Sequence, residues 1–363
     1  MTACMQQAVL SRGCGLSEPR YRHQTNQTEL QDSMDKGPRI GDAVLGGRYS
    51  LLAQVKGSIG RGTVFLGIAG RCRYCGQTDR ARFRTVAHAF PEALGNKWVI
   101  SRDECDACNQ IFSKYDDAIA RAVSPFLTLG GVKGKSNKVR QTGRSEGDAV
   151  ISRRGGTDGH GINMLANNAD PAQHITATAD GLIRMTMPVP DVPFRPRRAY
   201  KALVKMGIAL LPEEELDHYT KLRAWLLDAD DVVDFPNLDV GMSFASVGNA
   251  PPIAVGALLR RTIPTDVVPH ILFIFSAGSI CMQIDLMSDH LEDHLPPVPT
   301  DSINIEWSNV VYDPNGPETI AFRYGKPVHL NWSSLESEPQ PVKAVILDFN
   351  PQTCAGSLTP IFR

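Results

Sequence analysis

Four cysteines in the first third of the chain form two pairs with the same spacing. Cys72 and Cys75 are separated by two residues, and so are Cys105 and Cys108. Four thiolates can surround one Zn²⁺ tetrahedrally at ~2.3 Å, which closes the coordination shell and leaves no position for a substrate. In a small module, where apolar burial is limited, such an ion would supply much of the folding free energy. The spacing therefore predicts a structural zinc site.

The segment between the two pairs contains a histidine that could act as a base. His88 is followed by Pro91 and by a Leu-Gly-Asn sequence that ends at Asn96. A neutral imidazole, with an ordinary pKa of ~6.5, is basic enough near neutrality to take a proton from water. A core or surface histidine without a role is the alternative for this residue taken alone. Its place between two zinc-type pairs favours catalysis.

Asn109 directly follows the last cysteine of the second pair, near the expected start of a helix. Hard divalent ions such as Mg²⁺ and Mn²⁺ prefer oxygen ligands, and an amide oxygen is one of these. An asparagine near a helix start also commonly forms hydrogen bonds with the backbone. Both interpretations remain open from the position of Asn109 alone.

The order of these residues resembles the zinc-containing HNH endonucleases. The shared features, within residues 71–122, are a His-x2-Pro sequence after an extended segment, a Leu-Gly-Asn loop, and a CxxCN sequence that leads into a helix. The resemblance implies a small finger of two strands and a helix that hydrolyses nucleic acid, with DNA as the expected substrate. It also implies that His88 is the general base and that Asn109 binds a catalytic Mg²⁺ or Mn²⁺.

The sequence departs from the commonest HNH pattern at two positions. Ala87 stands immediately before His88, where many members carry an Asp, Glu or His that serves as a second metal ligand. Ile100 stands five residues before the third cysteine, where an asparagine is usual. We assign Asn96 to the catalytic site as a residue that orients His88. Formation of the turn is the equally open alternative for Asn96.

Positive charge is concentrated around this segment. Residues 56–145 contain 16 Lys or Arg and 7 Asp or Glu, a local charge of +9, and the whole chain has a net charge of −1, which leaves −10 for the rest. A basic loop just after the finger would contact phosphates without reading sequence. A solvated basic linker explains the same charges. The candidate nucleic-acid contacts are Lys133, Lys135, Lys138, Arg140 and Arg144.

The composition is that of a globular protein with more than one domain. The chain has 363 residues, of which 42% are hydrophobic, and the longest apolar stretch is interrupted by Pro and Gly, so we expect no membrane contact. The N-terminus lacks an export signal and the cysteines are arranged for metal, so we expect a cytoplasmic protein. The predicted divisions are a flexible tail (1–45), a nuclease domain (46–128), a basic glycine-rich linker (129–159) and a C-terminal domain (160–363).

Hydrophobic patterns predict an α+β fold: a zinc-held ββα-metal finger and a larger α+β body with a mainly antiparallel sheet. Residues 46–70 are typical of two short strands around a glycine turn. In the finger we expect strands at Phe83–Phe90 and Lys97–Ser101 and a helix from Asp106. In the body we expect helices at Arg197–Leu211 and Glu213–Leu227, followed by β-like runs at 267–276, 280–287, 302–312, 319–330 and 342–349.

These observations predict a metal-dependent endonuclease with a structural zinc ion and one catalytic divalent ion. An inactive zinc module that only binds nucleic acid is the main alternative, because the second metal ligand is absent. A third hypothesis makes the acidic C-terminal part a platform for protein interactions. That part resembles the extension found in HNH relatives, and its task stays open among sensing a signal in phage defence, guiding substrate and forming a homo-oligomer.

Overall fold

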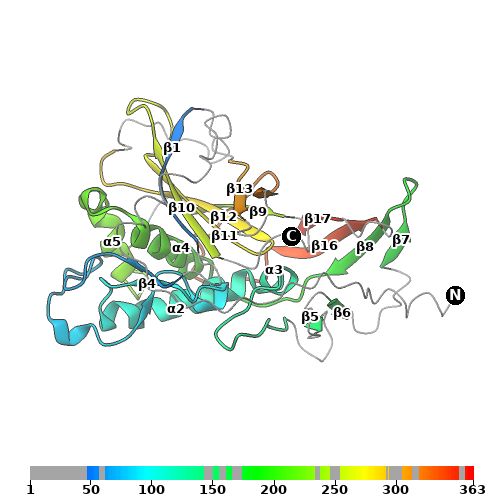
Figure 1. Ribbon diagram of the computed structural model, residues 1–363, viewed down its shortest axis with the longest axis horizontal. Helices are drawn as coiled ribbons and strands as arrows, with labels where there is room; N and C mark the ends of the chain where they lie inside the picture. Colours follow the sequence, from blue (N-terminus) through cyan, green and yellow to red (C-terminus); the bar gives the residue numbers. More distant parts are fainter. Residues whose placement is uncertain are drawn as a thin grey trace.

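The computed structural model of the chain describes residues 47–56, 62–142, 150–154, 161–165, 174–233, 238–245, 254–291, 293, 305–312, 319–350 and 356–363. These residues form an α+β protein whose sheets are mainly antiparallel, as the sequence predicts (Figure 1). The predicted N-terminal tail and Arg144 lie outside the described residues. No helix of the described part combines the length and the apolar character that crossing a membrane requires.

A six-stranded antiparallel sheet forms the centre of the body. Its order is β1-β10-β11-β12-β9-β15. All seven residues of β11 are buried, as expected for a strand that is covered on both faces. One face packs against the main apolar core, and a second buried cluster around Trp307 and Tyr324 packs against the other. The strands are β1 (Tyr49–Lys56), β9 (Asp239–Phe244), β10 (Ala254–Arg261), β11 (Ile271–Ala277), β12 (Ile280–Leu286) and β15 (Val328–Asn331).

Helix α4 (Pro196–Leu210) lies between this sheet and helix α2 (Asp106–Ala122), as Figure 1 shows. The predicted helix is confirmed to within one residue at each end. Gly207 allows the close approach, because a Cβ there would come within 2.9 Å of Leu286 on the sheet. An amphipathic helix usually keeps a polar face in water, but α4 is covered on both sides. Lys201 and Lys205 are therefore buried.

The finger contains a three-stranded sheet and α2. The strands are β2 (Val64–Leu66), β3 (Ala87–His88) and β4 (Val99–Ser101), in the order β2-β4-β3. β3 runs antiparallel to β4 and β2 runs parallel to it. Strands form within both predicted segments of the finger, and the predicted start of the helix at Asp106 is confirmed.

The first strand of the finger is shorter than the predicted Phe83–Phe90. A 3-10 turn, η1 (Arg80–Arg82), comes first, and the N–H of Ala81 donates to the side chain of Asp79. The N–H groups of Arg84 and Thr85 then donate to the Asp106 carboxylate at 3.0 and 2.9 Å instead of pairing with a strand. This capture of the backbone by the first residue of α2 delays the strand until β3.

The two strands predicted within residues 46–70 both form, but they belong to different sheets. β1 pairs with β10 of the body, and β2 pairs with β4 of the finger. The segment predicted as a linker is also in contact with the body where it is described. Gly130 lies so close to the β11–β12 turn that a Cβ there would be 2.7 Å from the backbone nitrogen of Ser279. Backbone packing thus joins both ends of the finger to the sheet.

The remaining described elements surround this arrangement. The predicted helix at Glu213–Leu227 is wrong in its first half, which forms the 3-10 helix η4 (Glu213–Tyr219) after Pro212, before α5 (Thr220–Leu227). A four-stranded sheet, β17-β16-β8-β7, extends to the right in Figure 1. The other elements are η2 (Glu92–Leu94), α3 (Ser124–Leu129), β5 (Val150–Arg154), β6 (Gly161–Leu165), β7 (Ile175–Ala177), β8 (Ile183–Pro188), β13 (Ser308–Tyr312), β14 (Thr319–Arg323), β16 (Val342–Phe349) and β17 (Gly356–Phe362).

Candidate zinc centre and active site

The four cysteines of the two pairs converge, as the spacing predicts. Their sulfurs all lie within 4.8 Å of one another, with Cys72 and Cys108 at 3.7 Å and Cys75 and Cys105 at 3.6 Å. A tetrahedron with Zn–S bonds of ~2.3 Å places neighbouring sulfurs ~3.8 Å apart. The side chains present therefore fit a structural zinc ion.

Without a cation, the sulfurs do not share the same protonation state. The hydrogen bond with Cys108 lowers the pKa of Cys72 to about 4 and raises the pKa of Cys108. Partial burial raises the pKa of Cys75 to about 11. Cys75 and Cys108 therefore hold their protons at neutral pH. A divalent cation would release these protons.

Arg73, the residue that follows Cys72, attaches the zinc centre to the body. Arg73 is buried and pairs with Asp103 at 2.6 Å. Its guanidinium also donates to the carbonyls of Ile208 (2.7 Å) and Leu211 (3.0 Å) at the C-terminal end of α4. A cation is favoured there because the last carbonyls of a helix have no partners within the helix. Arg73 thus joins the zinc centre to the C-terminal end of α4.

His88 lies on the exposed face of the finger sheet. It pairs with Ile100 of β4, and Ile100 pairs with Phe65 of β2, so these three side chains share one face. The neighbouring row, with Ala87 and Ser101 both buried, faces the interior. The side chain of His88 is 23% exposed. The base predicted from the sequence is therefore open to solvent at one side of its ring.

The surroundings of the imidazole favour its neutral form. Nε2 lies 3.7 Å from Oε1 of Glu92, and Nδ1 is buried without a hydrogen-bond partner in the described structure. Burial lowers the pKa of His88, the charges of Lys205 and Lys135 lower it further, and the carboxylate of Glu92 opposes them. A lowered pKa leaves the imidazole deprotonated near neutrality, as a general base requires.

A buried lysine of the body holds the backbone of His88. Lys205 on α4 donates from Nζ to the main-chain carbonyl of His88, and Nζ also lies 3.6 Å from Oε2 of Glu104. Burial raises the pKa of Glu104 to about 7 and also raises that of Asp116, and Lys205 opposes both shifts. The positive charge of Lys205 therefore stabilises the ionised forms of Glu104 and Asp116. The same ammonium group donates a hydrogen bond to a main-chain carbonyl of β3.

Asn96 lies in the loop after β3, and the structure does not bring it to the imidazole. Its amide nitrogen donates to the carbonyls of Phe90 (2.7 Å) and Val99 (2.9 Å), and its oxygen accepts from the N–H groups of Trp98 (3.1 Å) and Val99 (2.9 Å). These are the turn contacts that the sequence left as the alternative. An influence of Asn96 on His88 would pass through the backbone of this loop.

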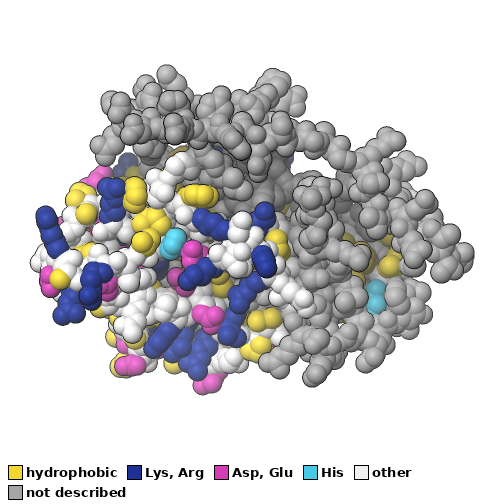
Figure 2. Space-filling model, turned by 60° about the horizontal axis from the view of Figure 1, so that its bottom comes forward, with side chains coloured by type: hydrophobic (Ala, Val, Ile, Leu, Met, Phe, Trp, Pro, Cys, Tyr) yellow, Lys and Arg dark blue, Asp and Glu magenta, His cyan; other side chains and the backbone are white. Residues whose placement is uncertain are grey.

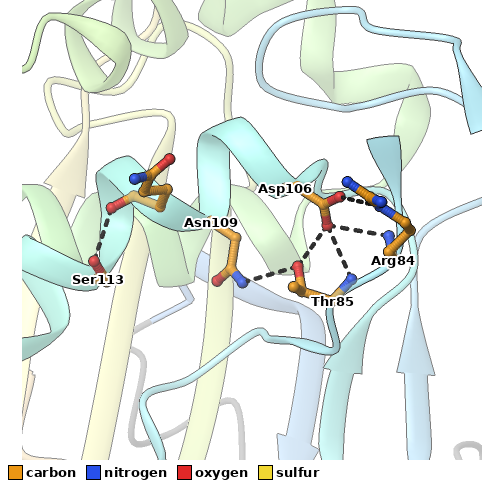
Figure 3. A pocket seen from close by; sticks show the side chains of 6 residues that line it. Arg84, Thr85, Asp106, Asn109 and Ser113 are labelled. Atoms are coloured by element: carbon orange, nitrogen blue, oxygen red, sulfur yellow. Dashed lines mark hydrogen bonds and ion pairs between the residues drawn. The ribbon is translucent and has the colours of Figure 1, made fainter. Parts of the chain in front are cut away.

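Asn109 lines an open pocket at the start of α2 (Figure 3). Its amide nitrogen donates to Oγ1 of Thr85 at 3.3 Å, and its amide oxygen has no protein donor among the described residues. Thr85 precedes His88 by three residues, so contact with Thr85 does not imply contact with His88. Asn109 therefore contacts the segment that leads into β3, but it does not contact His88. The pocket, of about 620 Å³, is lined by Arg84, Thr85, Asp106, Asn109, Gln110 and Ser113.

The predicted basic contacts are exposed and lie beside the loop that follows His88. An isolated bridge joins Lys133 to Val139. Lys135 reaches Glu92, with Nζ 4.0 Å from Oε2. The described members of the set, Lys133, Lys135, Lys138 and Arg140, are all exposed. Figure 2 shows Lys and Arg side chains gathered on the face of the molecule that holds α2 and β4.

Two residues of this site were not found from the sequence. Glu92 follows His88 by four residues, and that short spacing was the available signal for it. Lys205 is 117 residues away from His88, and a lysine in an amphipathic helix is ordinarily placed in water. Local patterns gave no signal for Lys205.

Comparison with known proteins agrees with the position of this site. A family model described as HNH endonuclease matches residues 72–124. The matched segment contains both cysteine pairs, His88 and Asn109. It supports an HNH module of the nuclease type with a cysteine cluster suited to zinc. No curated protein and no solved structure gives a significant match.

Proposed function

We propose that this protein is a metal-dependent endonuclease that hydrolyses phosphodiester bonds of nucleic acid, with DNA as the substrate. The observation that carries the proposal is the position of His88. It lies on the open face of a small sheet, in the same matched segment as the cluster of four cysteines, and that segment matches HNH endonucleases. A neutral imidazole on that face is suited to take a proton from a water molecule that attacks phosphorus.

The residues around His88 support a proton transfer of this kind. Burial keeps the pKa of the imidazole low, so it is ready to accept the proton. Once it is charged, the carboxylate of Glu92, 3.7 Å from Nε2, stabilises the imidazolium. Lys205 holds the main-chain carbonyl of His88, which fixes the strand that carries the ring. Positioning of this sort contributes much of the rate in enzymes.

Asn109 is the proposed ligand of the catalytic ion. Its amide oxygen is not used by a protein donor in the described part of the chain, and oxygen ligands suit Mg²⁺ and Mn²⁺. Such an ion, when bound, polarises the phosphate and stabilises charge on the departing oxygen. The cysteine set is the only cluster of three or more His, Cys, Asp or Glu close enough to share an ion among the described residues. Water and phosphate oxygens would therefore complete the shell.

The inactive zinc module remains the second candidate. Ala87 supplies no ligand beside His88, and no contact joins His88 to Asn109. A protein of this kind would bind nucleic acid through Lys133, Lys135, Lys138 and Arg140 without cutting it, because phosphate contacts alone give affinity.

Cleavage of supercoiled plasmid by the purified full chain, with Mg²⁺, Mn²⁺ or EDTA, separates the two candidates. We expect nicking with one of the two ions and none in EDTA. His88→Ala should reduce the rate by a factor of about 10² to 10⁴, the usual contribution of a general base, while zinc content stays unchanged. His290→Ala is the matched control, since His290 is exposed in the body. DNA retardation without cleavage under both ions would favour the inactive module.

A further inference from the structure

The exposed face of the finger sheet continues from His88 to an aromatic side chain on the far strand. Phe65 of β2 and His88 of β3 both pair with Ile100 of the central strand β4. Side chains of directly paired residues point to the same face of a sheet. Two interstrand spacings of about 4.8 Å separate the outer members of the row, so Phe65 lies about 10 Å from His88. Phe65 also precedes the segment that matches HNH endonucleases.

Phe65 has a cationic partner. The guanidinium of Arg102 stacks on its ring, 3.8 Å from the centroid. Arg102 is exposed, and no carboxylate pairs with it among the described residues. Phe65 is 50% exposed, and Val86, two residues before His88, is also exposed. The result is an apolar platform that carries an uncompensated positive charge and ends at the proposed base.

We propose that Phe65 and Arg102 form a second nucleic-acid contact, which binds the strand being cut. Arg102 would contact a backbone phosphate, and Phe65 would hold the guanidinium in place while it packs against the adjacent sugar or base. A planar guanidinium that is stacked on an aromatic ring keeps its N–H groups free for phosphate. This inference rests on the proposed function, because it takes His88 as the point of cleavage.

The pairing of Phe65 and His88 with Ile100 sets the distance between the proposed phosphate contact and the proposed site of cleavage. One strand of duplex DNA carries a phosphate every 3.4 Å along the helix axis. Because the strand also winds around that axis, neighbouring phosphates lie further apart than this rise, and a separation of about 10 Å corresponds to about one or two nucleotides. The charge of the surrounding segment, +9 over residues 56–145, favours a polyanion over a neutral or basic peptide as the occupant. The expected partner is a phosphate about one or two nucleotides from the cut.

Equilibrium binding of DNA measures this contact independently of cleavage. We would measure binding of a labelled DNA duplex over a range of salt concentrations, with all variants in a His88→Ala background so that the DNA stays intact. Arg102→Ala should weaken binding and reduce the slope of log K against log salt by about 1. Phe65→Ala should weaken binding about tenfold, as loss of a stacking contact does. Arg184→Ala, on β8, is the matched control and should bind like the parent.

DNA that carries an uncharged phosphate analogue at one position tests which phosphate Arg102 contacts. A duplex with a methylphosphonate about one or two nucleotides from the cut should bind the parent more weakly, and the same substitution should have no further effect on Arg102→Ala. Unchanged binding and salt slope in Arg102→Ala, with zinc content intact, would overturn the inference even if the wild type cuts DNA. Loss of binding in Arg102→Ala with a wild type that never cuts would support this contact and contradict the proposed chemistry. Equal sensitivity to neutral phosphates at every position would also overturn it.

Discussion

The two sides of the finger are built in opposite ways. On the buried side, polar groups are paired across the contact with α4: Arg73 with the helix carbonyls, Tyr74 with the carbonyl of Lys205 at 3.1 Å, and Lys205 with the carbonyl of His88. On the exposed side, the side chains of Phe65 and Arg102 contact each other, and no carboxylate in the described part of the chain pairs with Arg102. The difference is that the buried side fixes the backbone of His88, whereas the exposed side carries the proposed contact with nucleic acid.

The loop after His88 adds an apolar contact to this attachment. Phe90 is buried against β10, where a Cβ on Gly256 would come within 2.4 Å of its ring. Its ring also packs edge to face on Phe275 of β11, with centroids 5.4 Å apart. The body therefore contacts the strand of His88 through the backbone at one residue and through the core two residues later. These contacts give a physical reason for a large body beside a small HNH module.

Removal of zinc should have the largest effect, because the four sulfurs lie within 4.8 Å of one another and the ion is what would hold them together. Cys108→Ser should lose the ion, and the finger should unfold while the six-stranded sheet remains. Zinc content and limited proteolysis, with fragments mapped to residues 62–122, would measure this. Cys281→Ser, at a buried solitary cysteine of β12, is the control that should keep its zinc. A resistant finger in zinc-free Cys108→Ser protein would contradict the comparison.

The second prediction uses the two buried lysines of α4, which lie one turn apart. Lys205 contacts His88, whereas Lys201 pairs with Asp231 at 2.7 Å and donates to the carbonyl of Asp228. Replacing either by Met leaves buried carboxyl groups without their cation, which costs about 3–5 kcal/mol of stability. Only Lys205→Met should also reduce kcat, by about 10² with KM unchanged, since a small displacement of a catalytic group has that effect. Equal kcat values per folded molecule in the two variants would remove the positioning role of Lys205.

The parts that could be predicted from the sequence are the local ones. The cysteine spacing, the start of α2 after Cys105 and the pairing of β3 with β4 depend on residues close in the chain. The pairing of β1 with β10, and the contact of Lys205 with His88, join residues far apart. A lysine is ordinarily assigned to solvent, and only packing of α4 on both sides reverses that assignment. The turn contacts of Asn96 were one of two alternatives, and geometry was needed to choose.

The third prediction compares an asparagine on each side. Asn96→Ala should destabilise the protein by several kcal/mol, because buried groups of Phe90 and Val99 would lose their hydrogen bonds. Asn109→Ala should change stability by less than about 0.5 kcal/mol, as is usual for surface positions, but should abolish metal-dependent cleavage. Urea unfolding and plasmid nicking would measure the two effects. Stability loss in Asn109→Ala similar to that in Asn96→Ala would show that both have structural roles.

The smallest expected effect is a shift of the pH profile. Burial lowers the pKa of His88 below 6.5, so the neutral base persists below that pH, and kcat/KM should fall only as the pH drops through the lowered value. Glu92 raises the pKa of His88. Glu92→Gln should therefore move this acid limb to still lower pH. Glu336→Gln, at an exposed residue of the body, should leave the profile unchanged. A limb that moves upward in Glu92→Gln would show that the group titrating in catalysis is not the imidazole beside Glu92.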